Sequence, residues 1–68
     1  MAGTYKLIDV VGTSPDSMAA AVKNAVAEAS KTVRNMSWFE VVEQRGAIRD
    51  GKVLEFQVTV RIGFKLEP

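Results

Sequence analysis

The most constraining feature of this 68-residue sequence is an unbroken alternation of apolar and polar residues near its C-terminal end. From Val53 to Leu66, one set of alternate positions is apolar: Leu54, Phe56, Val58, Val60, Ile62, Phe64 and Leu66. The other set holds the polar residues Glu55, Gln57, Thr59, Arg61 and Lys65. Because successive side chains of a β-strand point to opposite faces, this segment is predicted to be a strand with one dry face.

A second strand, rich in Val, Phe and Trp, is predicted from Met36 to Ile48. The Asp50-Gly51 pair between the two segments favours the positive φ angles of a tight two-residue hairpin turn. The two segments are therefore predicted to form an antiparallel hairpin.

The turn also predicts which residues lie opposite each other. On the dry side, Phe39 is expected to pair with Ile62 and Val41 with Val60. On the polar side, Trp38 is expected to pair with Gly63, and Glu40 is expected to form a charge pair with Arg61. The same register turns Glu43 and Arg45 toward the apolar face. Either the hairpin overhangs whatever covers that face, or a bulge shifts the pairing, as Gly46 would allow.

The dry face is predicted to be covered by a helix from about Pro15 to Arg34. Ser14 is the expected N-cap, with Pro15 at the first helical position and Asp16 in the first turn. The expected buried stripe is Met18, Val22, Ala25, Val26, Ala29 and Val33. A further strand is expected from Tyr5 to Val11, ending at Gly12. The prediction is an α+β fold of β-α-β-β order, with residues 1–68 as a single domain.

Composition limits both the stability and the function of such a domain. A chain this short buries only about 60% of its unfolded surface and lacks disulfides, because it has no Cys. Since one helix covers one face of the sheet, other copies of the chain are expected to cover the Trp38 face. A net charge of +1 gives no argument for nucleic acid. No membrane span or signal peptide is recognised, so a soluble, cytoplasmic protein is expected.

Residues suited to catalysis are scarce. The sequence has neither His nor Cys, and its eight carboxylates are spread without a close pair. No metal site is therefore expected. Gly12-Thr13-Ser14 before the helix could hold an anion, but it lacks the glycine pattern of a phosphate loop, so capping is preferred. The residues favour a binding or structural protein over an enzyme.

Taken together and in order, several segments resemble the dodecin family. They are Tyr5-Lys6, Val11–Ser17, Ala29–Asn35, Trp38–Glu43, Asp50–Lys52, Glu55–Val58 and Phe64–Leu66. The resemblance implies a sheet wrapped around one helix and twelve copies that close into a hollow homododecamer. It also implies a non-catalytic protein that binds flavins in pairs at subunit interfaces, stores or buffers them, and quenches their photochemistry.

The resemblance assigns roles to four residues. Trp38 matches the tryptophan that stacks on the isoalloxazine ring, and Gln57 the glutamine that hydrogen-bonds its pyrimidine edge. Arg45 resembles a residue that contacts the phosphate of flavin mononucleotide (FMN), which leaves FMN or riboflavin as the expected cofactor. Lys65 stands where some members carry an arginine implicated in binding phosphate or coenzyme A, so coenzyme A is a further candidate ligand.

The predicted register bears on how such a site is built. Trp38 lies opposite Gly63, six residues from Gln57, which is roughly 20 Å at about 3.3 Å per residue. A site that uses both residues is therefore expected to join different subunits.

Other interpretations remain open. Trp38 could be a plain interface anchor, Gln57 a solvated strand residue, and Arg45 and Lys65 surface charges. A single-stranded nucleic-acid-binding module and a flavin-dependent enzyme subunit are the alternative functions.

Overall fold

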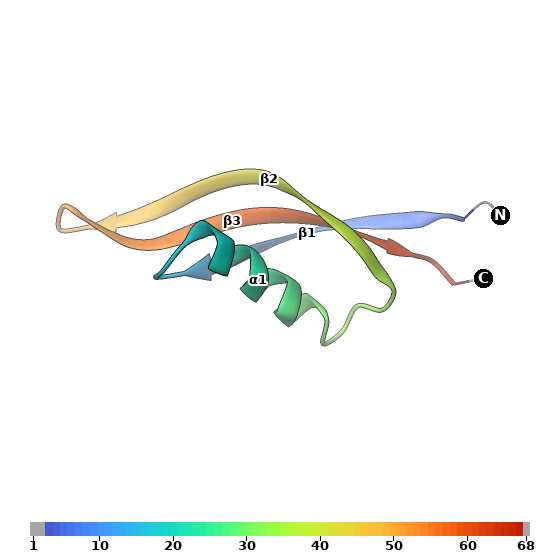
Figure 1. Cartoon of the computed structure of the whole chain (residues 1–68). Helices are drawn as coiled ribbons and strands as arrows, with labels where there is room; N and C mark the ends of the chain where they lie inside the picture. The colour runs from blue at the N-terminus through green and yellow to red at the C-terminus, as the bar shows by residue number, and fades with distance from the viewer. Residues whose placement is uncertain (1–2, 68) are drawn as a thin grey trace.

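The computed structural model describes residues 3–67. Its elements are β1 (Tyr5–Ser14), α1 (Met18–Ala29), β2 (Met36–Arg49) and β3 (Lys52–Lys65). β3 lies between β1 and β2 and is antiparallel to both. The helix lies on one side of this sheet (Figure 1). The predicted α+β fold of β-α-β-β order is confirmed.

The predicted hairpin turn is also confirmed, and so are the four residue pairs named above, but the predicted register does not hold from Glu43 to Ala47. Asp50 and Gly51 have φ angles of 53° and 75°. Along the hairpin, the four predicted pairs all form: Phe39 with Ile62, Val41 with Val60, Trp38 with Gly63 and Glu40 with Arg61.

Bulges shift the pairing at Glu43 and Arg45, so these two side chains do not lie on the apolar face. Val42 is an extra residue on β2, because Val41 pairs with Val60 and Glu43 with the adjacent Thr59. A second irregularity, between Ala47 and Ile48, leaves Leu54 as an extra residue on β3. It begins one residue after Gly46 on β2. Arg45 consequently pairs with Gln57, so it lies on the polar side of the sheet.

The expected start of the helix was wrong. The N-cap is Ser17, which has extended backbone angles and accepts a hydrogen bond from the Ala20 N–H at 2.9 Å. Ser14 is instead the last residue of β1, is buried, and accepts from the Asp16 N–H at 3.0 Å. Pro15 and Asp16 lie before the helix, because the backbone of Ser14 is still paired with β3.

The helix also ends earlier than Arg34. Its last residue is Ala29, and Ser30 is the C-cap. The Lys31 N–H then donates to the Glu28 carbonyl and the Thr32 N–H to the Ala29 carbonyl, a tightened final turn. Asn35, with a φ of 62°, redirects the chain into β2.

β1 continues past its predicted end at Gly12. Gly12 pairs with Val58 and lies directly against the helix. A Cβ atom on Gly12 would lie 2.7 Å from the Cβ of Ala25 and overlap the carbonyl of Ala21. The core formed at this contact consists of Ala21, Ala25, Ala29, Val58, Val60 and Ile62. Ala21 belongs to this core although the predicted stripe omitted it, whereas Val22, Val26 and Val33 are only half-buried.

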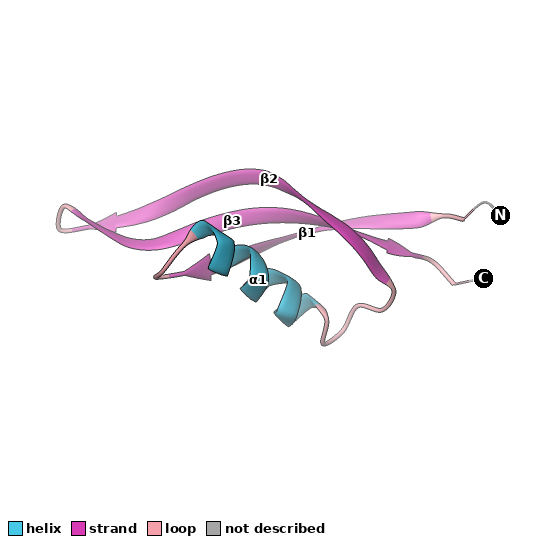
Figure 2. Cartoon of the chain, in the orientation of Figure 1, coloured by secondary structure: helices cyan, strands magenta, loops and turns pink. Residues whose placement is uncertain are grey.

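The helix covers only part of the sheet. It packs against β1 and β3, while the hairpin of β2 and β3 projects well beyond it (Figures 1 and 2). On the dry side of β2, Phe39 and Val41 are about half exposed, at 51% and 44%. An apolar groove therefore separates Phe39 from Val22 and Val26 of the helix. Within residues 3–67, no helix has the length and apolar character required to cross a membrane.

Candidate ligand-binding face

The sheet surface that points away from α1, called here the open face, carries all four of the predicted site residues. Its central strand contributes Glu55, Gln57, Thr59, Arg61, Gly63 and Lys65, the alternate positions to the buried Val58, Val60 and Ile62. Cross-strand pairing adds Trp38 and Arg45 from β2 and Tyr5 and Asp9 from β1. Trp38 and Arg45 share this face only because the Val42 bulge lies between them.

Aromatic residues occupy one end of the open face. Trp38 is 45% exposed, and its ring centroid lies 5.1 Å from that of Tyr5 at an interplanar angle of 52°. The indole also covers Gly63: a Cβ atom there would lie 2.6 Å from the Trp38 Cη2 atom and closer still to Cζ2 and Cε2. The part of the indole that these neighbours leave exposed is available to a ligand or to another subunit.

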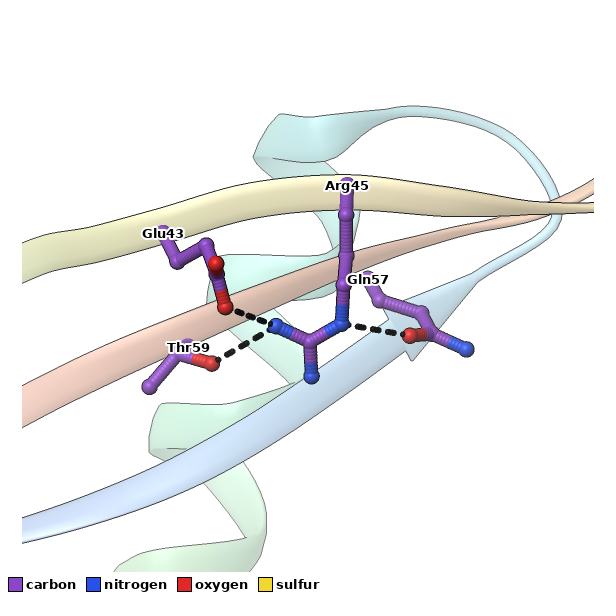
Figure 3. A network of polar contacts seen from close by, with 4 residues as sticks. All are labelled: Glu43, Arg45, Gln57 and Thr59. Carbon is purple, nitrogen blue, oxygen red and sulfur yellow. Dashed lines mark hydrogen bonds and ion pairs between the residues drawn. The ribbon is translucent and has the colours of Figure 1, made fainter.

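A polar network occupies the open face toward the hairpin turn (Figure 3). The Arg45 guanidinium donates from Nε to Gln57 Oε1 at 2.9 Å and from Nη1 to Glu43 Oε1 at 2.6 Å. Nη1 also donates to the Thr59 hydroxyl at 3.2 Å. The Gln57 amide nitrogen donates to Glu55 Oε2 at 2.7 Å. These bonds fix the direction of the Gln57 amide group: its oxygen faces Arg45 and its nitrogen faces Glu55.

An ion pair lies between the aromatic end and the polar network. Arg61 donates from Nε and Nη2 to the two carboxylate oxygens of Asp9, at 2.8 and 3.0 Å. The hydrogen bond from Arg61 holds the pKa of Asp9 below its usual value, and the same contact raises the pKa of Arg61. The register places Glu40 opposite Arg61 as predicted, but the guanidinium bonds to Asp9 rather than to Glu40.

The four predicted site residues fall into two groups. Arg45 and Gln57 are in direct contact. Trp38 lies at the other end of the face, and Lys65 lies near it, opposite Tyr5 on β1. The six-residue offset between Gly63 and Gln57 along β3 is as expected from the sequence.

Sequence reasoning missed the contacts made by Tyr5, Glu43 and Glu55. The contact of Tyr5 with Trp38 depends on the pairing of β1 with β3, which no local turn fixes. Glu43 and Glu55 join the network only after the bulges have set the register.

Comparisons with known proteins agree on one family. A family model described as Dodecin matches residues 4–67. Dodecin of Thermus thermophilus is 46% identical over 67 residues, which span 98% of this chain and 97% of the relative. The solved structure of dodecin from Streptomyces coelicolor has a TM-score of 0.94 and 52% identity, covering 97% of this chain and 94% of that one. Calcium dodecin of Mycobacterium tuberculosis is 33% identical over 64 residues, covering 94% of this chain and 90% of the relative.

Proposed function

This chain belongs to the dodecin family, and on that basis we propose that it is a non-catalytic protein that binds flavin, as FMN or riboflavin. In this proposal, a homododecamer stores or buffers the flavin and quenches its photochemistry. The observation that carries the proposal is the Trp38 indole on the open face, half exposed and held beside Gly63 and Tyr5. Indole offers a flat, electron-rich surface suited to stacking on an isoalloxazine ring.

Gln57 is suited to the polar edge of the same ring. Its amide has two N–H donors and an oxygen with two lone pairs, and the bonds to Glu55 and Arg45 engage one donor and one lone pair. The remaining donor and lone pair match a flavin carbonyl and an imide N–H. Because Gln57 is six residues along β3 from the partner of Trp38, we propose that the two residues meet a single flavin from different subunits.

The two cationic side chains supply the remaining parts of the proposal. Arg45 presents a planar guanidinium, which can pair with the phosphate of FMN. Lys65, at the aromatic end, is proposed as a contact for a second phosphate-bearing ligand such as coenzyme A. Among the described residues, Glu40, Glu43, Glu55 and Asp9 share the open face with these cations, which disfavours a nucleic-acid backbone as the ligand.

The test is substitution of the stacking residue. Trp38→Ala should weaken flavin binding by about 1 kcal/mol or more, because the aromatic contact is lost. It should also restore much of the fluorescence of bound flavin, since a stacked indole donates an electron to the excited ring. Titration of FMN and riboflavin into the parent and the variant, followed by flavin fluorescence, measures both effects.

Ile48→Ala is the matched control, because Ile48 is 77% exposed near the hairpin turn, far along β2 from Trp38. It should bind and quench flavin as the parent does. Flavin that remains equally quenched in Trp38→Ala would exclude Trp38 as the stacking partner.

A further inference from the structure

We propose that Tyr5 and Gly63 are positioning residues for Trp38, which hold the indole in the orientation needed for stacking. This inference rests on the proposed flavin binding. It assigns a role to one residue on β1 and one on β3, whereas the stacking residue itself belongs to β2.

Gly63 provides the space in which the indole lies. Gly63 is buried although it belongs to the open face, and the Trp38 ring is what covers it. The three atoms nearest to a Cβ built on Gly63 all belong to the Trp38 ring. Any side chain at this position would therefore displace the indole.

Tyr5 limits the tilt of the indole from the side. A centroid distance of 5.1 Å with an interplanar angle of 52° lies within the range of tilted aromatic pairs that attract each other. The backbone of Tyr5 is held in the sheet, because Tyr5 belongs to β1 and pairs with Lys65 of β3. Tyr5 is on β1 and Trp38 is on β2, and these two strands are not paired with each other. The ring of Tyr5 thus restrains Trp38 across the central strand β3.

The expected benefit is preorganisation. When the indole is already fixed, a stacking ligand does not have to stop the indole from rotating, so less conformational entropy is lost on binding. An indole that is free to rotate also has a less defined distance to the flavin, which reduces quenching. Both effects should respond to changes at Tyr5 and Gly63 that leave Trp38 itself in place.

The experiment uses Trp38 as its own reporter, because it is the only tryptophan in the chain. Steady-state fluorescence anisotropy of Trp38 is measured in the flavin-free assembly, and FMN is then titrated. Tyr5→Leu and Gly63→Ala should both lower the anisotropy and raise the dissociation constant of FMN by roughly two- to tenfold. Tyr5→Phe keeps the ring contact and should resemble the parent in both measurements.

Val11→Ala is the matched control. Val11 belongs to the same strand and face as Tyr5 and is similarly exposed, at 50% against 44%, but it lies opposite Thr59, away from Trp38. It should leave both anisotropy and FMN binding unchanged. Native mass spectrometry of each variant checks that the assembly is intact, and Gly63→Ala decides the result if Tyr5→Leu does not assemble.

The outcomes separate this inference from the proposed function. Parent-like anisotropy in both Tyr5→Leu and Gly63→Ala would overturn the positioning role. Lower anisotropy with unchanged FMN affinity and quenching would overturn its relevance to the ligand. If the parent binds no flavin at all, the proposed function fails, while the anisotropy of the flavin-free variants still decides whether Tyr5 and Gly63 hold Trp38.

Discussion

Arg45 is the residue whose role depends most on its immediate neighbours. Its guanidinium already bonds to Glu43, Gln57 and Thr59 within the protomer. A phosphate at this position would therefore share Arg45 with the Glu43 carboxylate, whose charge opposes its binding. We expect the affinity for FMN to depend on both the attraction of Arg45 and the repulsion of Glu43.

Arg45→Ala should weaken FMN binding by about 1 to 3 kcal/mol, the range for a hydrogen bond to a charged group. Riboflavin ends in a hydroxyl and should lose much less. Added salt should reduce the preference for FMN in the parent, because a phosphate near the surface is screened. Fluorescence titration of both flavins into both proteins measures the difference, and equal losses for the two flavins would mean that Arg45 does not read the phosphate.

Glu43→Gln is the complementary change. It removes the carboxylate that lies 2.6 Å from Arg45 Nη1 and keeps the size of the side chain. FMN should bind more tightly to this variant, while riboflavin should be affected little. The same titration tests it, and weaker FMN binding would argue that Glu43 orients Arg45 rather than competing for it.

At the residue scale, the sequence predicted which side chains belong to the polar face of β3 but not their contacts. Gln57 could be placed there from alternation alone. Its bond to Arg45 could not, because the turn-derived register directs Arg45 to the opposite face. The correct orientation depends on an extra residue at Val42, and no residue type at that position marks a bulge.

At the scale of elements, α1 packs tightly against β1 at Gly12. Gly12→Ala should lower the free energy of unfolding by about 1 to 3 kcal/mol, because the new methyl group would overlap the Ala21 carbonyl of the helix backbone. Chemical denaturation monitored by circular dichroism measures the loss. Gly3→Ala is the control, since its Cβ would meet mainly the flexible end of Lys65. Equal stability of the two variants would contradict the close packing inferred at Gly12.

How well each element could be predicted depended on how close together in the sequence its determining residues lie. The hairpin turn is encoded by two adjacent residues, Asp50 and Gly51, and was placed correctly. The helix start was not, since Ser14 and Ser17 are both good N-caps. The choice between them is made by the pairing of Ser14 with Phe56, a contact between residues far apart in the sequence.

At the scale of the whole molecule, the isolated protomer is extended. Its radius of gyration is 14.0 Å, whereas a compact domain of this length would have about 11 Å. Its accessible surface is 4998 Å², against about 4200 Å² for a compact monomer of 7.4 kDa. The exposed apolar side chains include Phe39 and Val41 on one side of the sheet and Trp38 on the other. Both sides of the sheet therefore offer surface for association.

We accordingly expect a closed homo-oligomer, with twelve copies as the proposed number. Native mass spectrometry at micromolar concentration should detect this assembly and little monomer. Phe39→Asp should shift the distribution toward smaller species, because it places a charge beside the apolar groove formed with Val22 and Val26. Phe39→Leu should keep the parent distribution. A parent protein that is mainly monomeric would contradict the expectation.

Because of the bulge at Val42, the number of residues between Trp38 and Arg45 determines whether both side chains lie on the open face. The two positions are an odd number apart, so a regular strand would send their side chains to opposite faces. Deleting Val42 would keep every side chain of the candidate site and give β2 a more regular pleat, yet it would remove either Trp38 or Arg45 from the open face. Between these residues the chain should therefore tolerate changes of residue type more readily than the gain or loss of a single position.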